Sequence, residues 1–314
     1  MKKAALVFLI SLFSFSVSAI CSGDSRSFTE VLFQNKDITI FKCKILSYEK
    51  GFYAAEIIQT FLGATDGTKV KLKTPGPRTP MIYKIGEEVL IYTSGTGNEF
   101  SLNGTCSDMN KIITSDANTQ HELKTLAEFA DIFKNKRSGE FKFYFASKKL
   151  AAEGKYTNGQ ATGLWKHFYE NGQLKTEQDF EKNYSNFYSE NGFISSSSKS
   201  TKDSTVNLIY SNKNKGAVTY KFVDIPNDTG FVSMNYEFYE NKNVKLIQSL
   251  AYRVKGTATS FLGTYGKYYE FYDNGKIKVS GTYFDSKRVG VWKNFDKDGK
   301  LKTEFDFKDG KTQR

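Results

Sequence analysis

The residues that could carry chemistry are few and scattered. The chain of 314 residues contains two histidines, His121 and His167, and neither stands beside a recognisable partner motif. No nucleophile elbow, P-loop or dinucleotide fingerprint occurs, because the segment 95–97 lacks the further glycine and the helix that such a fingerprint needs. We therefore expect no catalytic residue and interpret the protein as a binding protein rather than an enzyme. An unrecognised secreted hydrolase stays as an alternative, since carboxylates pair in space and the chain has 34 acidic residues.

The three cysteines, Cys21, Cys43 and Cys106, all lie in the N-terminal part of the chain. Three cysteines with only two histidines, and without an H-E-x-x-H helix, exclude a multi-cysteine zinc module. We therefore expect no metal ligand and no cofactor. In an exported protein the simplest reading of this count is one disulfide and one spare thiol.

The N-terminus has the pattern of an export signal. Lys2 and Lys3 precede an apolar run over residues 4–15, and the small residues Ser18 and Ala19 follow. The run is shorter than the ~20 residues that span a bilayer, and its small-residue flank suits a signal peptidase. We expect residues 1–19 to be removed and the protein to be secreted or held in the periplasm or cell envelope.

Two alternatives to a simple export signal bear on the same region. Lipidation of Cys21 is disfavoured because Ile20 stands where lipoprotein signals carry a small residue. A permanent anchor is disfavoured by the length of the apolar run, and no other stretch approaches a transmembrane length. The remainder of the chain is therefore expected to be soluble and long enough for two domains.

The net charge of +11 and the pI near 9.2 set the expected partners. The basic residues are mostly lysines, spread evenly and interleaved with acidic residues, and export makes nucleic acid an unsuitable partner. Such a surface keeps a β-protein from pairing edge to edge. The alternative is weak contact with anionic surfaces such as acidic glycans or lipid headgroups.

A change in composition near residue 140 predicts a domain boundary. Fifteen of the 19 tyrosines lie beyond it, and glycine-containing turn signals begin to recur there. Just before it, residues 118–137 have the apolar spacing of an amphipathic helix, which Thr114, Ser115 or Asp116 could cap. We expect one domain over residues 20–138, including this helix, and a second over residues 139–314.

The N-terminal domain reads as short strands between turn clusters. The strand-like runs are residues 38–46, 52–61, 69–73, 88–92 and 100–102. Glycine and proline clusters separate them and provide the backbone angles that hairpin loops need. Five strands followed by a helix predict a small closed barrel, and the whole chain is expected to be mostly β.

This domain resembles the OB-fold module of tissue inhibitors of metalloproteinases and the netrin-like group. The resemblance rests on Cys21, on the strand 38–45, on the segment 83–92 and on Cys106 just after a strand. It implies a disulfide between Cys21 and Cys106, with Cys43 left as a buried free thiol. It also implies metalloproteinase inhibition as an alternative function. The family's C-x-C start is missing, and Ile20 precedes the cysteine whose free amino group would chelate zinc.

The second domain contains repeats. Residues 163–177 closely match residues 290–304, and weaker copies lie near 143–150, 187–192, 238–246 and 268–277. The period of ~20 to 24 residues and the alternation of apolar with charged residues predict stacked β-hairpins. Asn171-Gly172, Asn274-Gly275 and Asp298-Gly299 are expected to be two-residue hairpin turns in which both residues have positive φ. Residues 195–235 fit no repeat and are either diverged strands or an irregular insertion.

These segments resemble MORN repeats in their bacterial variant, written roughly as G-x-W-x-x-Y-Y-x-N-G-x-L. The resemblance implies a scaffold or interaction surface with little chemistry of its own. Trp165, Tyr169, Tyr272 and Trp292 are the candidate partner surface. For the two tryptophans the competing interpretation is a buried core position, which is the commoner role of an aromatic residue at repeat spacing. We expect the partner to be a protein or a polysaccharide.

Overall fold

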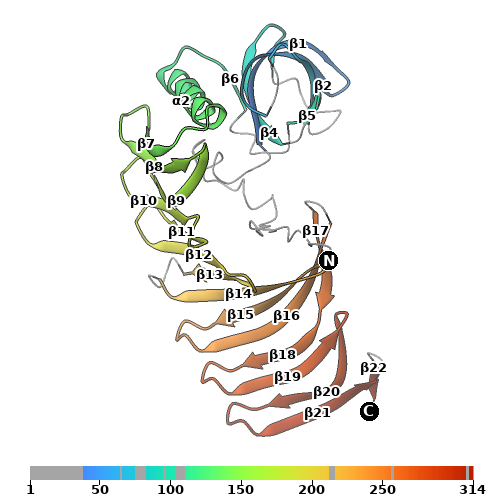
Figure 1. Ribbon diagram of the computed structural model, residues 1–314. Helices are drawn as coiled ribbons and strands as arrows, with labels where there is room; N and C mark the ends of the chain where they lie inside the picture. The colour runs from blue at the N-terminus through green and yellow to red at the C-terminus, as the bar shows by residue number, and fades with distance from the viewer. Residues whose placement is uncertain are drawn as a thin grey trace, which may run out of the picture. The chain divides into compact units, whose positions relative to one another are not determined.

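The computed structural model describes residues 38–63, 66–74, 83–94, 97–102, 110–211, 216–255, 258–308 and 311–313. The chain divides into two compact units that meet between Gly172 and Gln173 (Figure 1). The predicted export signal and the predicted disulfide between Cys21 and Cys106 lie outside the described residues. The boundary predicted at residue 138 falls in the first unit, just before a strand begins at Gly139.

A small mixed sheet forms the N-terminal part of the first unit. Its strands are β1 (Ile38–Glu49), β2 (Phe52–Leu62), β3 (Lys69–Lys73), β4 (Glu88–Ser94), β5 (Glu99–Ser101) and β6 (Lys111–Ile112). They follow the order β5-β3-β2-β1-β4-β6, and β3 and β5 run parallel. The predicted closed barrel is wrong for the described residues, because no ladder joins β4 to β5. The Thr93 hydroxyl on β4 donates a hydrogen bond of 3.1 Å to the Ser101 carbonyl on β5.

Strand β1 is buried on both faces. Phe41, Cys43 and Ile45 point into the main core of the sheet, as their alternation predicts, whereas Ile40 lies in a second cluster with Leu126. Cys43 is a free, buried thiol, which confirms that part of the prediction. Burial raises the pKa of this thiol to about 12, so the nucleophilic thiolate is scarce at neutral pH.

The predicted helix is α2 (Ala117–Lys134). Asp116 caps its start, because one carboxylate oxygen accepts hydrogen bonds of 3.0 Å from the backbone N–H groups of Asn118 and Thr119. Leu126 packs on the small sheet, while Phe129 lies 6.2 Å from the ring of Tyr156 in the first repeat hairpin. The helix therefore joins the small sheet to the repeats within the first unit.

Three further strands complete the first unit: β7 (Gly139–Tyr144), β8 (Leu150–Thr157) and β9 (Gln160–Phe168). They are consecutive antiparallel neighbours. Asn158 and Gly159 form the tight turn between β8 and β9 with φ values of 52° and 74°, the double positive φ of a two-residue hairpin. The Gly159 N–H donates to the Arg137 carbonyl, which ties this turn to the end of α2.

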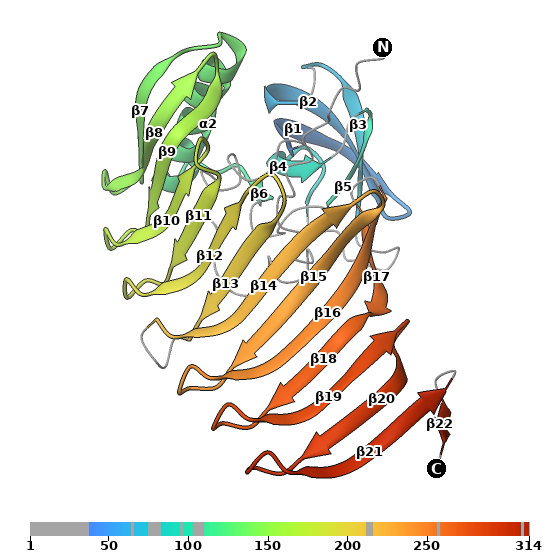
Figure 2. The same ribbon diagram turned by 60° about the horizontal axis from the view of Figure 1, so that its bottom comes forward.

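The second unit is a long antiparallel sheet (Figure 2). Its strands are β10 (Leu174–Asp179), β11 (Tyr184–Tyr188), β12 (Ile194–Ser200), β13 (Thr205–Tyr210), β14 (Val218–Asn227), β15 (Gly230–Phe238), β16 (Val244–Lys255), β17 (Ala258–Thr264), β18 (Gly266–Phe271), β19 (Ile277–Phe284), β20 (Lys287–Phe295), β21 (Leu301–Lys308) and β22 (Lys311–Gln313). Neighbours in sequence pair in turn, except that β17 pairs only with β16 and β18 continues the sheet. The described residues of the segment 195–235 thus form the regular strands β12 to β15, which favours diverged strands over an irregular insertion.

The hairpin tips at the glycine signals differ from the prediction. At Gly275 the φ is 83°, whereas Asn274 does not have a positive φ, and the Gly275 N–H donates to the Tyr272 carbonyl. This is a longer turn in which only the residue at the bulge is left-handed, so the predicted pair of positive φ values is wrong here. Lys148 and Lys242 occupy the same left-handed position in other tips, with φ values of 64° and 70°.

Candidate binding surface

The two faces of the second unit's sheet have different chemistry. Directly paired residues share a face, so the register places Val206, Val223 and Met234 in one row across β13, β14 and β15. The next row carries Leu208, and on β16 it carries Ile247. Val232 lies on the same side of β15 as Met234. We call this side of the sheet the apolar face, and its six apolar residues are Val206, Leu208, Val223, Val232, Met234 and Ile247. All six side chains are half-buried, and no second layer of described elements from this unit packs on them.

The opposite side, the polar face, carries a hydrogen-bonded ladder. The Ser198 hydroxyl donates to the Asn207 side-chain oxygen at 2.8 Å, and the Asn207 amide donates to Asp224 at 2.9 Å. Ser233 on the next strand donates to Asn235 at 2.8 Å. Partial burial raises the pKa of Asp224 despite its hydrogen bonds from Ser233 and Asn207. Ile209, Phe222 and Leu250 share the rows of this face, so its polar ladder runs beside apolar side chains.

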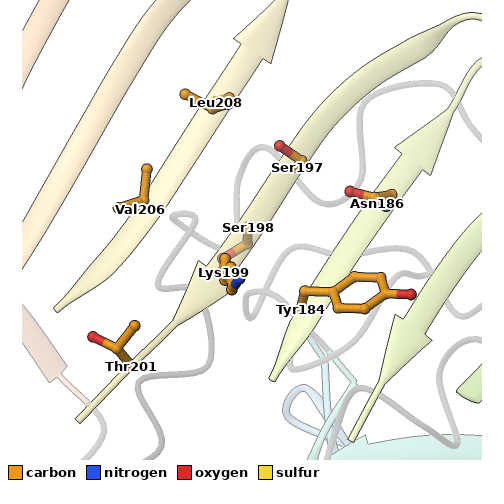
Figure 3. A pocket seen from close by; sticks show the side chains of 8 residues that line it. All are labelled: Tyr184, Asn186, Ser197, Ser198, Lys199, Thr201, Val206 and Leu208. Atoms are coloured by element: carbon orange, nitrogen blue, oxygen red, sulfur yellow. The ribbon is translucent and has the colours of Figure 1, made fainter. Parts of the chain in front are cut away.

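A hollow of about 540 Å³ lies at one end of the apolar face. Figure 3 shows its lining on three adjacent strands, with Tyr184 and Asn186 on β11, Ser197 and Lys199 on β12, and Val206 and Leu208 on β13. Ser198 and Thr201 complete the lining. Pattern analysis of the sequence missed this site, although the serine run 195–198 was its visible signal.

Trp165 and Trp292, two of the residues predicted as a partner surface, are core residues. Their exposed fractions are 0% and 1%, so neither indole is available to a partner, and their assignment to a binding surface is corrected. Each indole N–H donates to a backbone carbonyl, that of Lys155 at 3.0 Å and that of Thr282 at 3.2 Å. A buried tryptophan needs such an acceptor, and both repeats provide it at the same relative position.

Each indole lies on a glycine of the neighbouring strand. A Cβ built on Gly154 would stand 2.1 Å from the ring of Trp165, and one built on Gly281 would stand 2.1 Å from the ring of Trp292. A tyrosine ring then closes each site edge-on, with its centroid 4.9 Å from the indole. The two repeats thus share one packing unit made of glycine, tryptophan and tyrosine, which explains the spacing of these residues in the sequence.

Tyr169 and Tyr272, the other two predicted surface residues, are half-buried at hairpin tips. The Tyr272 hydroxyl donates to the Phe295 carbonyl of the next tip at 2.8 Å, and Lys297 lies 6.0 Å from its ring centroid. Part of this side chain is therefore used to join tips. Contact of either tyrosine with a partner stays a prediction.

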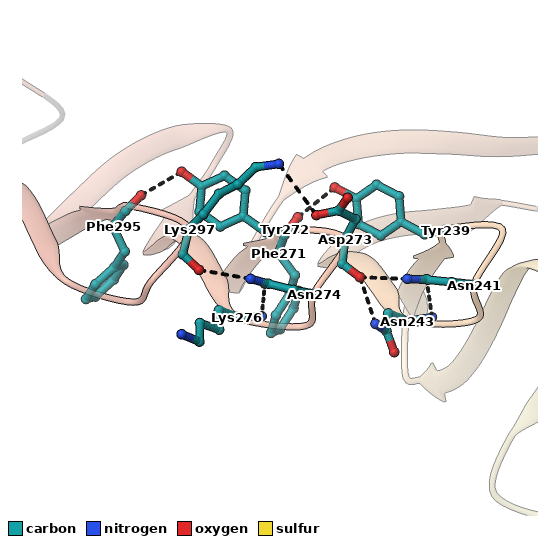
Figure 4. Close-up of polar contacts among 10 residues, drawn as sticks. All are labelled: Tyr239, Asn241, Asn243, Phe271, Tyr272, Asp273, Asn274, Lys276, Phe295 and Lys297. Carbon is teal, nitrogen blue, oxygen red and sulfur yellow. Dashed lines mark hydrogen bonds and ion pairs between the residues drawn. The ribbon is translucent and has the colours of Figure 1, made fainter.

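The same bonds recur from tip to tip (Figure 4). Tyr239 donates to the Phe271 carbonyl, as Tyr272 donates to that of Phe295. Asn241 donates to the Asp273 carbonyl at 2.7 Å, as Asn274 donates to that of Lys297 at 2.9 Å. Each of these two tips therefore donates through its tyrosine and asparagine to the backbone of the tip that follows.

The last tip departs from this rule. Asp296 and Asp298 occupy the positions that Tyr272 and Asn274 occupy one repeat earlier. The Asp296 carboxylate accepts hydrogen bonds from the backbone N–H groups of Asp298 and Lys300, at 3.0 and 2.8 Å, and these bonds lower its pKa. A carboxylate cannot donate to a following tip, so the ladder of tips ends here.

The two histidines lie apart in the first unit, one on the helix and one in the repeats. His121 donates through Nε2 to the Tyr144 carbonyl at 2.6 Å, and His167 is buried beside Trp165 with their ring centroids 6.5 Å apart. No group of three or more histidine, cysteine, aspartate or glutamate side chains is placed to hold a metal within the described ranges. In the same ranges, no helix is long and apolar enough to cross a membrane.

Comparison with known families identifies the repeats. A family described as "MORN repeat variant" matches residues 137–158, 161–182, 264–285 and 288–309. The C-terminal half carries MORN-variant repeats. Each matched MORN segment contains two consecutive strands and the tip between them, and the Trp165 and Trp292 packing units lie in these segments. Strands β11 to β17 continue the sheet outside the matches.

The comparison with curated proteins does not extend this assignment. No curated protein matches the chain. The MORN segments lie outside the small N-terminal sheet, and the resemblance of that sheet to tissue inhibitors of metalloproteinases finds no support.

Proposed function

We propose that the protein is an exported, non-enzymatic adaptor that binds a protein or a polysaccharide through its β-repeat surface. The observation that carries this proposal is the apolar face of the second unit. A sheet normally buries one apolar face against a second layer. Here that face has no covering layer within the described part of its unit, and its opposite side carries the hydrogen-bonded polar ladder beside Ile209 and Phe222.

The composition of the apolar face favours a binding role. Contiguous apolar surface on a soluble protein commonly marks an interaction site. Lys221 and Tyr236 occupy the positions between Leu208 and Ile247 in the second row, with the Lys221 ammonium 5.4 Å from the ring centroid of Tyr236. Aromatic residues and methionine, such as Tyr236 and Met234, are enriched in protein interfaces.

Export and weak attraction to anionic surfaces are part of the same proposal. The N-terminal pattern supports export, and the net charge of +11 supports attraction to acidic components of an envelope. The unsupported netrin-like resemblance leaves metalloproteinase inhibition without an observation in its favour.

The test compares the two faces of one strand in the mature full-length protein. Met234→Gln alters the apolar face of β15, and Asn235→Gln alters the polar face of the same strand. Both proteins are checked for an unchanged thermal melt and then used to capture components of an envelope extract. We expect Met234→Gln to lose a specific protein or polysaccharide that Asn235→Gln retains. Equal capture by both variants, or no specific component with the unaltered protein, would overturn the proposal.

A further inference from the structure

The hollow exists because a strand of small side chains lies between strands of large ones. On β12 the residue facing the hollow between Asn186 and Leu208 is Ser197, since the register pairs it with both. The adjoining row places Tyr184, Lys199 and Val206 side by side. The serine forms a low floor, while the tyrosine on one side and the aliphatic side chains on the other form walls (Figure 3).

The size and lining of the hollow suit a small ligand or one unit of a polymer. Its volume of about 540 Å³ lies within the range of roughly 300–1,000 Å³ that is typical of small-molecule sites. Val206, Leu208 and the Tyr184 ring offer apolar surface, whereas Asn186 and Ser197 offer an amide and a hydroxyl. This mixture is complementary to a ligand with an apolar ring face and several hydroxyl groups.

The hydroxyl groups of Tyr184 and Ser197 are oriented by hydrogen bonds to residues that do not line the hollow. The Tyr184 hydroxyl donates to the Glu177 carboxylate at 2.7 Å, and this hydrogen bond is the main cause that raises the tyrosine pKa to about 12. The Ser197 hydroxyl lies 3.2 Å from the Tyr210 hydroxyl. Oriented polar groups lose less conformational entropy when they bind a ligand.

The charge of the hollow is that of a single lysine. Lys199 is the one charged residue among its lining residues, it is exposed, and it forms no ion pair with another of the described residues. The nearest buried carboxylate in its row, Asp179, is already paired with Lys182 at 3.3 Å. A ligand in this hollow would therefore gain from one negative charge placed at Lys199.

We propose that the hollow binds one acidic sugar unit of a polysaccharide. The sugar ring lies against Tyr184 and the aliphatic wall, its hydroxyl groups meet Asn186 and Ser197, and its carboxylate meets Lys199. This inference rests on the proposed adaptor function and names a ligand class for one part of its surface.

The test uses defined oligosaccharides and the full mature protein. The probes are tetrasaccharides of galacturonate and mannuronate, with methyl-esterified galacturonate as the uncharged control, and binding is measured by titration calorimetry. Ser197→Tyr fills the hollow, while Ser197→Ala leaves it open. Lys199→Gln removes the charge in the hollow, while Lys202→Gln removes an exposed charge outside it.

We expect at least one uronate to bind and its methyl ester to bind about tenfold more weakly, the loss typical of one charged hydrogen bond. Ser197→Tyr should abolish binding and Lys199→Gln should weaken it about tenfold. Ser197→Ala should weaken it only about fivefold, through the loss of one neutral hydrogen bond, and Lys202→Gln should bind like the unaltered protein. No uronate binding, or equal affinities for Ser197→Tyr and Ser197→Ala, would overturn the inference. Binding of anionic lipid vesicles that needs Lys199, without uronate binding, would overturn it as well.

The two proposals fail separately. If the protein captures an envelope component that Met234→Gln loses, but binds no uronate, the adaptor function stands and the sugar site is wrong. If uronates bind in the hollow but Met234→Gln and Asn235→Gln capture the same components, the sugar site stands and the wider apolar face is not the adaptor surface.

Discussion

Adding one methyl group to Gly281 should unfold the last repeats more easily. The Cβ of an alanine at this position would lie 2.1 Å from Cδ2 and 2.2 Å from Cε2 of Trp292. Carbon atoms pack favourably at about 3.5–4 Å, so the indole would have to move by well over 1 Å. The backbone of Gly281 does not have a positive φ, so steric crowding, not backbone strain, causes the effect.

The expected loss can be bounded from the surroundings of Trp292. The ring is enclosed by Tyr268 and Tyr283, with centroid distances of 5.5 and 4.9 Å, and the Arg288 guanidinium lies 4.3 Å from it. Movement would also lengthen the hydrogen bond to the Thr282 carbonyl. Overpacking of this kind costs about 1–3 kcal/mol, and we expect the upper end because the ring has no open side. Trp292→Ala should cost about 3–5 kcal/mol through the cavity it leaves.

A double-mutant cycle separates crowding from general damage. In the double variant Gly281→Ala with Trp292→Ala the crowding is absent, and the new methyl group fills part of the cavity. The double variant should therefore lose less free energy of unfolding than the two single variants lose together, by about 2 kcal/mol. Urea unfolding followed by circular dichroism gives the free energies, and peptide-resolved hydrogen exchange over residues 264–308 localises them. Additive losses, or a Gly281→Ala protein as stable as the unaltered one, would refute the packing unit. Gly154 with Trp165 repeats the test in the first unit.

Three further predictions concern local chemistry. Asp116→Ala should lower the melting temperature of the first unit through loss of the helix cap, while Asp116→Asn keeps most of it. Because hydrogen bonds from Thr114 and Thr119 lower the pKa of Asp116, its ionised form stabilises the fold above the unfolded pKa of about 3.9. That stability is lost as the pH falls towards the pKa of Asp116 in the folded state. Thermal melts between pH 2 and 6 should therefore show a smaller fall in melting temperature on acidification for Asp116→Asn than for the unaltered protein. Lys242→Gly should stabilise the second unit by up to about 1 kcal/mol by relieving a left-handed φ of 70°, and an equal gain from Lys242→Ala would contradict that cause. Cys43 should resist iodoacetamide at pH 8 in the native protein and react fully in urea, because burial raises its pKa to about 12. Mass spectrometry of the peptide that contains Cys43 measures the labelling. Rapid labelling of the native protein would contradict the burial of this thiol.

Local patterns predicted most of the elements. The run 69–73 is strand β3, the helix begins one residue before its predicted start, and the cap is one of the three residues proposed. These features depend on neighbouring residues, such as Asp116 and the N–H groups that follow it, and are therefore visible in the sequence. The tryptophan repeats were visible for the same reason.

Features that depend on distant residues were not predictable. Closure of the small sheet depends on pairing between β4 and β5, which no local pattern reports, and the described residues form no ladder between these two strands. The strand β12 was missed because its serines give no apolar alternation, although its partners on β11 and β13 hold it in register. The hollow depends on that same strand and was hidden with it.

The forward-donating tips give the repeat array a direction, and this has a consequence for how such proteins change in length. A copy of the hairpin whose tip starts at Tyr272 would bring its own tyrosine and asparagine for the next tip and its own carbonyls for the previous one. Gene duplication can therefore add an internal hairpin without a compensating change elsewhere. A hairpin added after the tip at Asp296 would differ, because the side chains of Asp296 and Asp298 offer it no hydrogen-bond donor. Arrays of this kind should grow from the middle, with the older terminal hairpin carried along as a fixed end.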